Sequence, residues 1–176
     1  PIDTSYYDNE KHTQADALSV IPFMDEMNYE GLSVSGLSDG YYGLTIGGEF
    51  IGRFTARELE RGINMALLQN TPQYKQAMKI RQMNEERWLK ERKMREFYWV
   101  EYNLMRKTGM LWACNEAAVD TLRKYRPHDI FLQWNGALWL QYMHKGIRED
   151  CVNEQQDLVN QIYEQNKPIP LQIEIK

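Results

Sequence analysis

Residues 37–72 read LSDGYYGLTIGGEFIGRFTARELERGINMALLQNTP, and this stretch combines two turn signals with two helix starts. The first turn signal is Asp39-Gly40, which separates the apolar run 32–37 from the run 41–46. Asp-Gly readily adopts the left-handed backbone that a tight hairpin needs. We therefore predict that these two runs are neighbouring antiparallel strands.

The second turn signal is Gly47-Gly48, which is followed by a third apolar run over residues 49–54. Apolar residues that alternate with polar ones are typical of half-buried strands. The stretch therefore predicts a meander of three short antiparallel strands. The period-two spacing places two pairs of side chains on shared faces: Leu44 with Ile46, and Phe50 with Phe54.

Two helix starts follow the strands. Thr55-Ala-Arg-Glu58 has the capping-box pattern, in which the threonine hydroxyl accepts a backbone N–H of the first turn and the glutamate reaches back to the cap. Gly62 gives this short helix a natural end. Thr71 and Pro72 predict the second start, because threonine caps helices and proline at the first helical position loses no hydrogen bond.

Downstream of Pro72 the sequence is helical in character. No Gly or Pro interrupts residues 73–107, and Lys107-Thr108-Gly109 marks a helix end by charge and by glycine. We therefore predict one long helix here. Six apolar residues recur at spacings compatible with one stripe along it: Tyr74, Ala77, Met78, Met83, Trp88 and Leu89.

The next predicted helix covers residues 110–125, and Arg126-Pro127 ends it. It carries three apolar residues on one side: Leu111, Ala118 and Leu122. In the aromatic segment 128–146, Asn135-Gly136 is expected to break the chain into a short piece and then a helix. That helix runs through three apolar residues: Leu138, Leu140 and Met143.

A final helix is predicted over residues 149–165, and Pro168-Ile-Pro170 ends it. It carries four apolar residues: Val152, Leu158, Val159 and Ile162. Residues 171–175 alternate like a half-buried strand, and we expect this strand to return to the N-terminal sheet.

These patterns together define an α+β fold. A small antiparallel β meander in the N-terminal part, joined by the C-terminal strand, is followed by a helical hairpin or bundle of about four helices. Residues 1–70 form a β-rich subdomain, and residues 71–176 form a helical subdomain with a C-terminal strand. With 176 residues the chain is long enough to bury a sizeable core, and we expect the two parts to pack as one unit.

Composition and charge exclude several classes of protein. No apolar run approaches the roughly twenty residues that span a bilayer, so no membrane span is predicted. The net charge of −4 and the pI near 5.5 argue against nucleic acid as a partner, because a backbone binder needs positive charge to displace counterions. Basic residues between Lys75 and Arg95 alternate with glutamates in pairs such as Glu86 with Lys90 and Glu91 with Arg95. We interpret this segment as a solvated helix face.

The stretch that begins at Gly36 resembles the non-catalytic C-terminal region of a group of bacterial SGNH (GDSL-type) esterases and lipases. In that group a similar series of short blocks follows the hydrolase domain. The matching blocks here are Gly36-Leu-Ser-Asp-Gly40, Leu44-Thr-Ile-Gly-Gly48, Ile51-Gly52, Phe54-Thr55, Glu58-Leu59, Gly62-Ile-Asn-Met-Ala66 and Thr71-Pro72. A weaker likeness extends back through Pro22-Phe-Met-Asp-Glu-Met-Asn28 and forward to Lys167-Pro168.

The chemistry of an SGNH hydrolase is missing from this sequence. Such an enzyme needs a nucleophilic serine in a Gly-Asp-Ser-like block, an Asn donor to the oxyanion, and an Asp-x-x-His pair that activates the serine. The residues three positions before His12, His128 and His144 are not aspartates. Asp8 lies four positions before His12, a spacing that we attribute to chance.

The resemblance therefore implies an accessory region of a larger serine esterase or lipase, and this chain by itself is not expected to be catalytic. The implied partner is the catalytic domain of the same polypeptide or an associated hydrolase. The implied substrates are esters, including acylated carbohydrates, and no cofactor or metal is implied. The family resemblance also implies a periplasmic or secreted protein. The start at Pro1 shows no signal peptide, so we expect a processed or excised chain.

The alternative is a stand-alone module whose aromatic helical half binds a glycan or a protein. Aromatic faces pack well against sugar rings, although most aromatic residues in helices fill a core. Nine residues form this aromatic set: Trp88, Trp99, Trp112, Trp134, Trp139, Tyr98, Tyr102, Tyr125 and Tyr142. We select Trp134, Trp139 and Tyr142 as the candidate ligand contacts. An exposed patch favours the module, whereas burial favours the accessory region.

Other candidate groups are scattered along the helical half. His128-Asp129 and His144 invite a metal or acid–base interpretation, but such isolated residues more often serve packing or solvation. Glu116 and Asp120 share a helix face without the fixed geometry of a glycosidase pair. Cys114 and Cys151 lack the spacing of a zinc site, and either a disulfide or two buried free thiols is compatible with the sequence.

Overall fold

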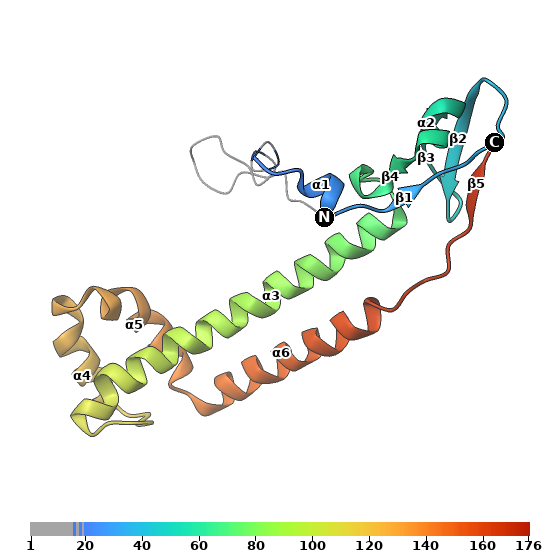
Figure 1. Ribbon diagram of the computed structural model, residues 1–176. Helices are drawn as coiled ribbons and strands as arrows, with labels where there is room; N and C mark the ends of the chain where they lie inside the picture. The colour runs from blue at the N-terminus through green and yellow to red at the C-terminus, as the bar shows by residue number, and fades with distance from the viewer. Residues whose placement is uncertain (1–15, 17, 19) are drawn as a thin grey trace. The chain divides into compact units, whose positions relative to one another are not determined.

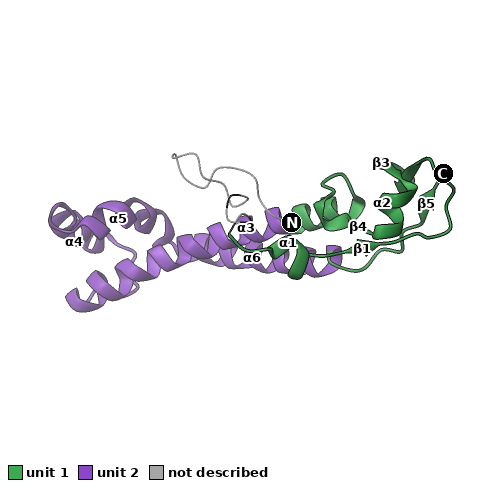
Figure 2. Ribbon diagram, turned by 45° about the horizontal axis from the view of Figure 1, so that its top comes forward, with its two compact units in different colours: residues 1–80, 166–176 green, residues 81–165 purple. Residues whose placement is uncertain are grey.

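The computed structural model describes residue 16, residue 18 and residues 20–176. Asp8 and His12, whose spacing we attributed to chance, lie outside these residues. The fold is α+β, as predicted, with a small antiparallel sheet and a set of helices (Figure 1). Two compact units divide the chain (Figure 2). Unit 1 contains residues up to Ile80 together with Asn166–Lys176, and unit 2 contains Arg81–Gln165.

The sheet of unit 1 is built on the hairpin that Gly47-Gly48 predicted. β2 (Tyr41–Ile46) and β3 (Glu49–Thr55) pair antiparallel, with Ile46 opposite Glu49. The φ angles of Gly47 and Gly48 are 59° and 83°, a backbone that residues with a Cβ rarely adopt. These two glycines therefore give the hairpin its two-residue turn.

The third strand of this sheet is β5 (Ile173–Ile175), so the strand order is β3-β2-β5. The predicted return of the C-terminal strand is confirmed. The predicted pairing of residues 32–37 with β2 is wrong, because β1 (Gly31–Leu32) instead pairs with β4 (Ile63–Asn64). Ile175 lies opposite Leu44 and extends the apolar core, whereas the rival segment is interrupted by Gly36 with φ 81°.

A β-bulge in the hairpin corrects one predicted face. The register shifts between Leu44, which faces Gly52, and Thr45, which faces Phe50, so Ile51 is the extra residue on β3. Ile51 is buried and Phe50 is exposed, while Phe54 packs against the core. Phe50 and Phe54 therefore do not share a face, since the bulge breaks the period of two between them. The buried residues of this core are Leu44, Ile46, Ile51 and Met65.

The capping box that begins α2 (Ala56–Arg61) is complete, as predicted. The Thr55 hydroxyl accepts the Glu58 backbone N–H at 3.2 Å, and the Glu58 carboxyl accepts the Thr55 backbone N–H at 2.7 Å. These bonds from the Thr55 backbone and hydroxyl hold the pKa of Glu58 below its usual value. Gly62, with φ 92°, ends the helix. The chain thus leaves the sheet through a fixed helical turn.

Replacement of Thr55 by alanine is expected to lower the free energy of unfolding by about 1 kcal/mol, because the first turn loses its side-chain acceptor. Urea unfolding followed by circular dichroism measures this effect. Thr55→Ser keeps the hydroxyl and is the matched control. Equal losses in the two variants would show that the hydroxyl does not stabilise the helix.

Two short helices complete the described part of unit 1. They are α1 (Phe23–Glu26) and the 3₁₀ turn η2 (Met65–Leu67). The long helix α3 (Pro72–Val100) then begins as predicted, with the Thr71 hydroxyl accepting the Tyr74 backbone N–H at 3.2 Å. Met83 is buried, but Trp88 and Leu89 of the predicted stripe are exposed.

Unit 2 starts inside α3, which continues as the π-helical segment η3 (Glu101–Met105) and the 3₁₀ turn η4 (Arg106–Thr108). Gly109 ends this run in the left-handed conformation, as the sequence predicted. The remaining elements are α4 (Glu116–Tyr125), the 3₁₀ turn η5 (Arg126–His128), α5 (Ile130–Tyr142) and α6 (Lys145–Gln165).

Three features of the helices in unit 2 differ from the prediction, and one is that α6 begins at Lys145 rather than at residue 149. α4 begins at Glu116 rather than near residue 110, because the Asn115 side chain caps it by accepting the Ala118 backbone N–H. α5 runs unbroken through Asn135-Gly136. A Cβ on Gly136 would lie 3.3 Å from the Arg126 Cδ atom and 3.4 Å from the Leu122 Cδ1 atom, so this glycine permits close helix packing instead of a turn.

The helices of unit 2 pack around a core that contains Phe97 and Trp139, which are fully buried. α6 lies beside α3, where Lys90 pairs with Glu154 and the Cys151 thiol donates to the Lys90 carbonyl oxygen at 3.7 Å. The buried residues of the unit 2 core are Met94, Phe97, Val100, Leu104, Met105, Ala118, Leu122, Leu132, Trp139, Tyr142, Met143 and Cys151.

Candidate functional site

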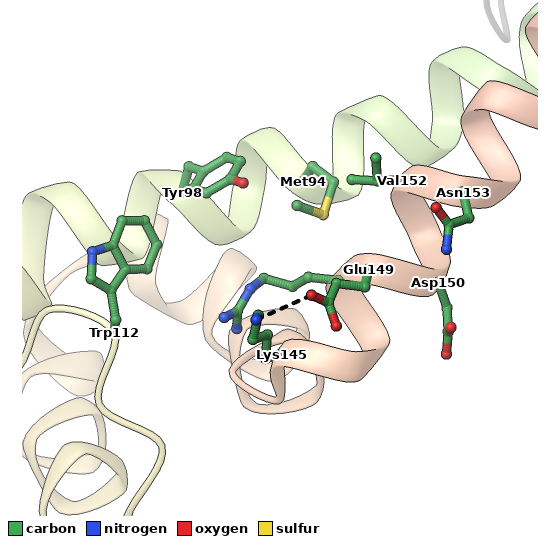
Figure 3. Close-up of a pocket in the computed structure, with 9 residues that line it drawn as sticks. Met94, Tyr98, Trp112, Lys145, Glu149, Asp150, Val152 and Asn153 are labelled. Atoms are coloured by element: carbon green, nitrogen blue, oxygen red, sulfur yellow. Dashed lines mark ion pairs between the residues drawn. The ribbon is translucent and has the colours of Figure 1, made fainter.

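A pocket of about 640 Å³ opens in unit 2, and Figure 3 shows the side chains around it. α3 and α6 contribute most of its wall, and the loop before α4 contributes Trp112. This volume lies within the range of small-molecule sites. The lining residues are Met94, Tyr98, Trp112, Lys145, Arg148, Glu149, Asp150, Val152 and Asn153.

Trp112 is held in an unusual conformation at this pocket. Its φ is 63°, in the left-handed region, where a bulky residue is a genuine outlier. The Trp112 backbone N–H donates to the Glu101 Oε2 atom at 2.8 Å, and this bond fixes the loop. Trp112 is 45% exposed, and its ring packs edge-on against Tyr98 and Tyr102. Trp112 thus combines a left-handed backbone with partial exposure at the pocket lining.

Glu101 links this loop to the core. Its side chain is buried, with 1% exposure of the residue, and its second oxygen, Oε1, accepts the Trp139 indole N–H at 2.8 Å. Glu101 begins the π-helical segment η3, and such π segments occur frequently at functional sites. A single buried carboxyl group thus positions both the core indole and the backbone of Trp112.

Arg148 supplies a fixed positive charge on the α6 side. Its Nη1 atom donates to the carbonyl oxygens of Tyr142 and Met143, at 2.6 and 2.7 Å, at the C-terminal end of α5. Its guanidinium lies 4.8 Å from the centre of the Phe97 ring. Cations are favourable at helix C-termini and over aromatic faces. Lys145, by contrast, forms an exposed ion pair with Glu149 at 3.2 Å (Figure 3).

The lining of this pocket combines aromatic and charged side chains. Exposed aromatic rings offer flat apolar contact, and the cations and carboxylates offer polar contacts. The described residues that line the pocket include no serine, cysteine or histidine, so the Ser–His and Cys–His pairs of many hydrolases are absent from this lining. The pocket therefore offers both apolar and charged groups for contact with a ligand.

A second pocket of about 440 Å³ contains the predicted pair His128-Asp129. The Asp129 Oδ1 atom accepts the backbone N–H groups of Phe131 and Leu132 at 2.8 and 3.1 Å, so this carboxylate caps α5. His144 is held elsewhere, with its Nδ1 atom 3.3 Å from the Cys114 Sγ atom. The structure thus divides the predicted histidine set between two places.

The three aromatic residues selected from the sequence lie on α5 but in different environments. Trp134 is 65% exposed, whereas Trp139 is fully buried and Tyr142 is buried beside it in the core. Burial, and then the hydrogen bond with Cys151, raise the pKa of Tyr142 to about 12, so its phenol is neutral near pH 7. Ligand contact by these residues stays a prediction, and Trp134 is the member that solvent reaches.

The pocket residues Tyr98 and Trp112 belong to the wider aromatic set of the sequence, which gave no reason to choose them. Their exposure depends on the Glu101 bond and on α6, both of which are tertiary features. The left-handed φ of Trp112 could not be predicted from the sequence, because glycine and asparagine are the residues that usually indicate such a conformation.

The remaining predicted groups have structural partners. Glu116 and Asp120 both accept hydrogen bonds from Arg123, at 2.8 and 2.9 Å. The predicted pair Glu91 with Arg95 is present at 3.9 Å, but Lys90 pairs with Glu154 instead of Glu86. The Glu91–Arg95 pair supports the interpretation of an ion-paired helix face for the basic segment, whereas Lys90 contacts α6.

Both cysteines are free, so the disulfide alternative is wrong, and of the two thiols only Cys151 is buried. Within residues 20–176 and the two described residues before them, no group of three or more His, Cys, Asp or Glu side chains is placed to hold a metal ion. Among the same residues, no helix has the length and apolar character needed to cross a membrane.

Comparison with known protein families gives a match for the helical part of the chain. Residues 78–167 match the family described as the diltiazem deacetylase C-terminal helical domain. The match spans half of the 176 residues, and the chain belongs to this family. The predicted relation to the C-terminal region of a hydrolase is confirmed at this level, since a deacetylase is a hydrolase.

A solved structure described as BT4096, a gut microbial diltiazem-metabolizing enzyme, is 36% identical to this chain with a TM-score of 0.88. The similarity covers 100% of this chain and 40% of that one. This chain therefore spans less than half the length of that enzyme. No curated protein matches the sequence.

Proposed function

We propose that this chain is the accessory C-terminal region of a larger SGNH-type serine hydrolase that cleaves esters. The observation that carries the proposal is the family match over residues 78–167, together with 36% identity to 40% of a larger diltiazem-metabolizing enzyme. The SGNH type is supported by the block series from Gly36 to Pro72, which resembles the region after an SGNH catalytic domain. The proposed catalytic Ser, Asn and Asp-x-x-His lie in that domain, outside this chain.

The placement of the histidines supports a catalytic centre elsewhere. In the described part of the chain, His128 lies in a pocket with the capping residue Asp129, and His144 contacts Cys114. Neither histidine has an aspartate three positions before it in the sequence. The SGNH mechanism that we propose uses the histidine of an Asp-x-x-His pair, so we assign the activating base to the catalytic domain.

The proposed substrates are acyl esters on a larger alcohol, including acylated carbohydrates. The family description refers to deacetylation, which is removal of an acetyl group. The pocket beside Trp112 offers flat aromatic contact and polar groups that suit the alcohol part of such an ester. We therefore propose that the helical unit contributes to substrate recognition and the catalytic domain supplies the chemistry.

Hydrolysis of p-nitrophenyl acetate tests the proposal. The chain of residues 1–176 should release no more than one equivalent of p-nitrophenol per molecule, whereas a protein that also carries the upstream hydrolase domain should turn over many equivalents. The variant Cys114→Ser, measured alongside, removes any stoichiometric release by this exposed thiol. Multiple turnover by residues 1–176 alone would contradict the proposal.

The second candidate, a stand-alone glycan- or protein-binding module, is favoured by the exposed rings of Tyr98, Tyr102 and Trp112. Complete burial of Trp139 counts against the wider aromatic platform that this candidate needs. The same assay separates the two candidates. A stand-alone module predicts no turnover from the extended protein either.

A further inference from the structure

We propose that Cys114 is a modification site for small thiol-reactive electrophiles and disulfides, with His144 as its general base. The Cys114 Sγ atom lies 3.3 Å from the His144 Nδ1 atom, within hydrogen-bond reach for sulfur. Both side chains belong to exposed residues, so a reagent reaches the pair from solvent. This inference does not depend on the proposed ester hydrolysis.

Structured segments hold both partners in place. Cys114 directly precedes Asn115, whose side chain caps α4, and it follows the loop that Glu101 fixes through the Trp112 backbone. His144 lies between the last residue of α5 and the first residue of α6. The thiol and the imidazole are therefore presented by the ends of packed helices rather than by long free loops.

The pair is linked to the rim of the 640 Å³ pocket. Trp112 lies two residues before Cys114 and Lys145 directly follows His144, and both Trp112 and Lys145 line the pocket. A group attached to the sulfur thus adds bulk to the same loop that presents the indole. Modification of Cys114 is therefore expected to alter access to the pocket as well as the thiol itself.

The reaction follows from the geometry. With the imidazole proton on Nε2, the Nδ1 atom accepts the thiol proton as the sulfur attacks. With iodoacetamide a carbon–sulfur bond forms, the carbon–iodine bond breaks and iodide leaves with the electron pair. With a small disulfide the sulfur forms a mixed disulfide and the other thiolate leaves. In both cases the imidazolium then returns its proton to water.

Cys151 is the internal comparison. It is buried, and its thiol donates to the Lys90 carbonyl oxygen at 3.7 Å and lies 3.7 Å from the Gln155 amide. A thiol closed off by α3 in this way cannot meet a reagent unless the helices separate. The chain therefore carries one accessible thiol with a base and one protected thiol without access.

Peptide mapping of the whole chain during reaction with iodoacetamide at pH 7 tests the proposal. A positioned base contributes roughly 10²–10⁴-fold in enzyme sites, and for a reagent that is not held by the protein we expect about a tenfold faster alkylation of Cys114 than in urea. His144→Gln should remove about this factor. His128→Gln, the same change at an exposed histidine away from the thiol, should leave the rate unchanged. Cys151 should react only in urea.

Two results would overturn the proposal. One is an alkylation rate of native Cys114 no higher than that of the urea-unfolded wild-type chain, a comparison that needs no variant to fold. The other is an unchanged Cys114 rate in a folded His144→Gln variant, as judged by circular dichroism. Reaction with 5,5′-dithiobis(2-nitrobenzoate) should follow the same order and release one equivalent of thiolate per native chain.

Discussion

Replacement of Trp139 by alanine is expected to lower the free energy of unfolding by about 3–5 kcal/mol, the cost of deleting a large aromatic side chain from a packed core. Trp139 is fully buried among the helices of unit 2, so its removal leaves a cavity that rigid neighbours fill only in part. The loss also leaves the Glu101 Oε1 atom without its indole donor. Urea unfolding followed by far-ultraviolet circular dichroism measures the change.

Trp134→Ala is the matched control, because Trp134 lies on the same helix and is 65% exposed. Its main ring contact is with Phe131, at 5.5 Å between ring centres, and we expect a loss of no more than about 1 kcal/mol. Similar losses in the two variants would contradict the division of these tryptophans between core and surface. A large loss of stability for Trp134→Ala alone would indicate that Trp134, and not Trp139, is the core residue.

Replacement of Glu101 by alanine is expected to cost about 3 kcal/mol, because it leaves two donors without their acceptor. The donors are the Trp112 backbone N–H and the Trp139 indole N–H, each at 2.8 Å. Each buried donor left unsatisfied costs about 1–3 kcal/mol. Urea unfolding gives the stability, and near-ultraviolet circular dichroism reports the tryptophan environments.

Glu101→Gln retains one carbonyl acceptor and should lose less stability than Glu101→Ala. Glu85→Ala is the control, since Glu85 is an exposed glutamate on α3 and its loss should change stability by no more than about 0.5 kcal/mol. The Glu101 variants should also change the near-ultraviolet signal, as the Trp112 loop loses its anchor. If Glu101→Ala were as stable as Glu85→Ala, the buried carboxyl group would not hold the loop and the core together.

These two predictions address one network. Glu101 accepts hydrogen bonds from the Trp139 indole in the core and from the backbone of Trp112 at the pocket. The stability of unit 2 and the shape of its pocket therefore both depend on this carboxyl group. A double-mutant cycle can combine Glu101→Ala with Trp139→Phe, which removes the indole N–H and keeps an aromatic ring. The losses in the free energy of unfolding should therefore be non-additive. The hydrogen bonds of Glu101 that stabilise the core therefore also hold the Trp112 loop of the pocket in place.

Local features of the fold were predictable from the sequence. The capping box at Thr55, the turn at Gly47-Gly48 and the start of α3 at Thr71-Pro72 each depend on residues within a few positions of one another. Their backbone geometry follows from hydrogen bonds and steric limits inside one turn. The neighbouring chain does not need to be known for such features.

The candidate site was much less predictable. Trp134 and Trp139 are the same residue type on one helix, and the helices packed on each side of α5 decide which indole solvent reaches. Cys114 and His144 are thirty positions apart in the sequence, so no spacing rule could pair them. Gly136 looked like a helix break but serves close packing against Arg126.

By itself, the sequence determined the α+β class, the Gly47-Gly48 turn, the helix caps at Thr55 and Thr71 and the C-terminal strand, because short-range sterics and periodicity fix them. The tertiary structure decided which strand takes the free edge of β2, which aromatic rings are buried and how Glu101 reaches Trp112. Those outcomes depend on contacts between segments that are distant in the chain, and their free energies come from packing and burial that no local pattern encodes.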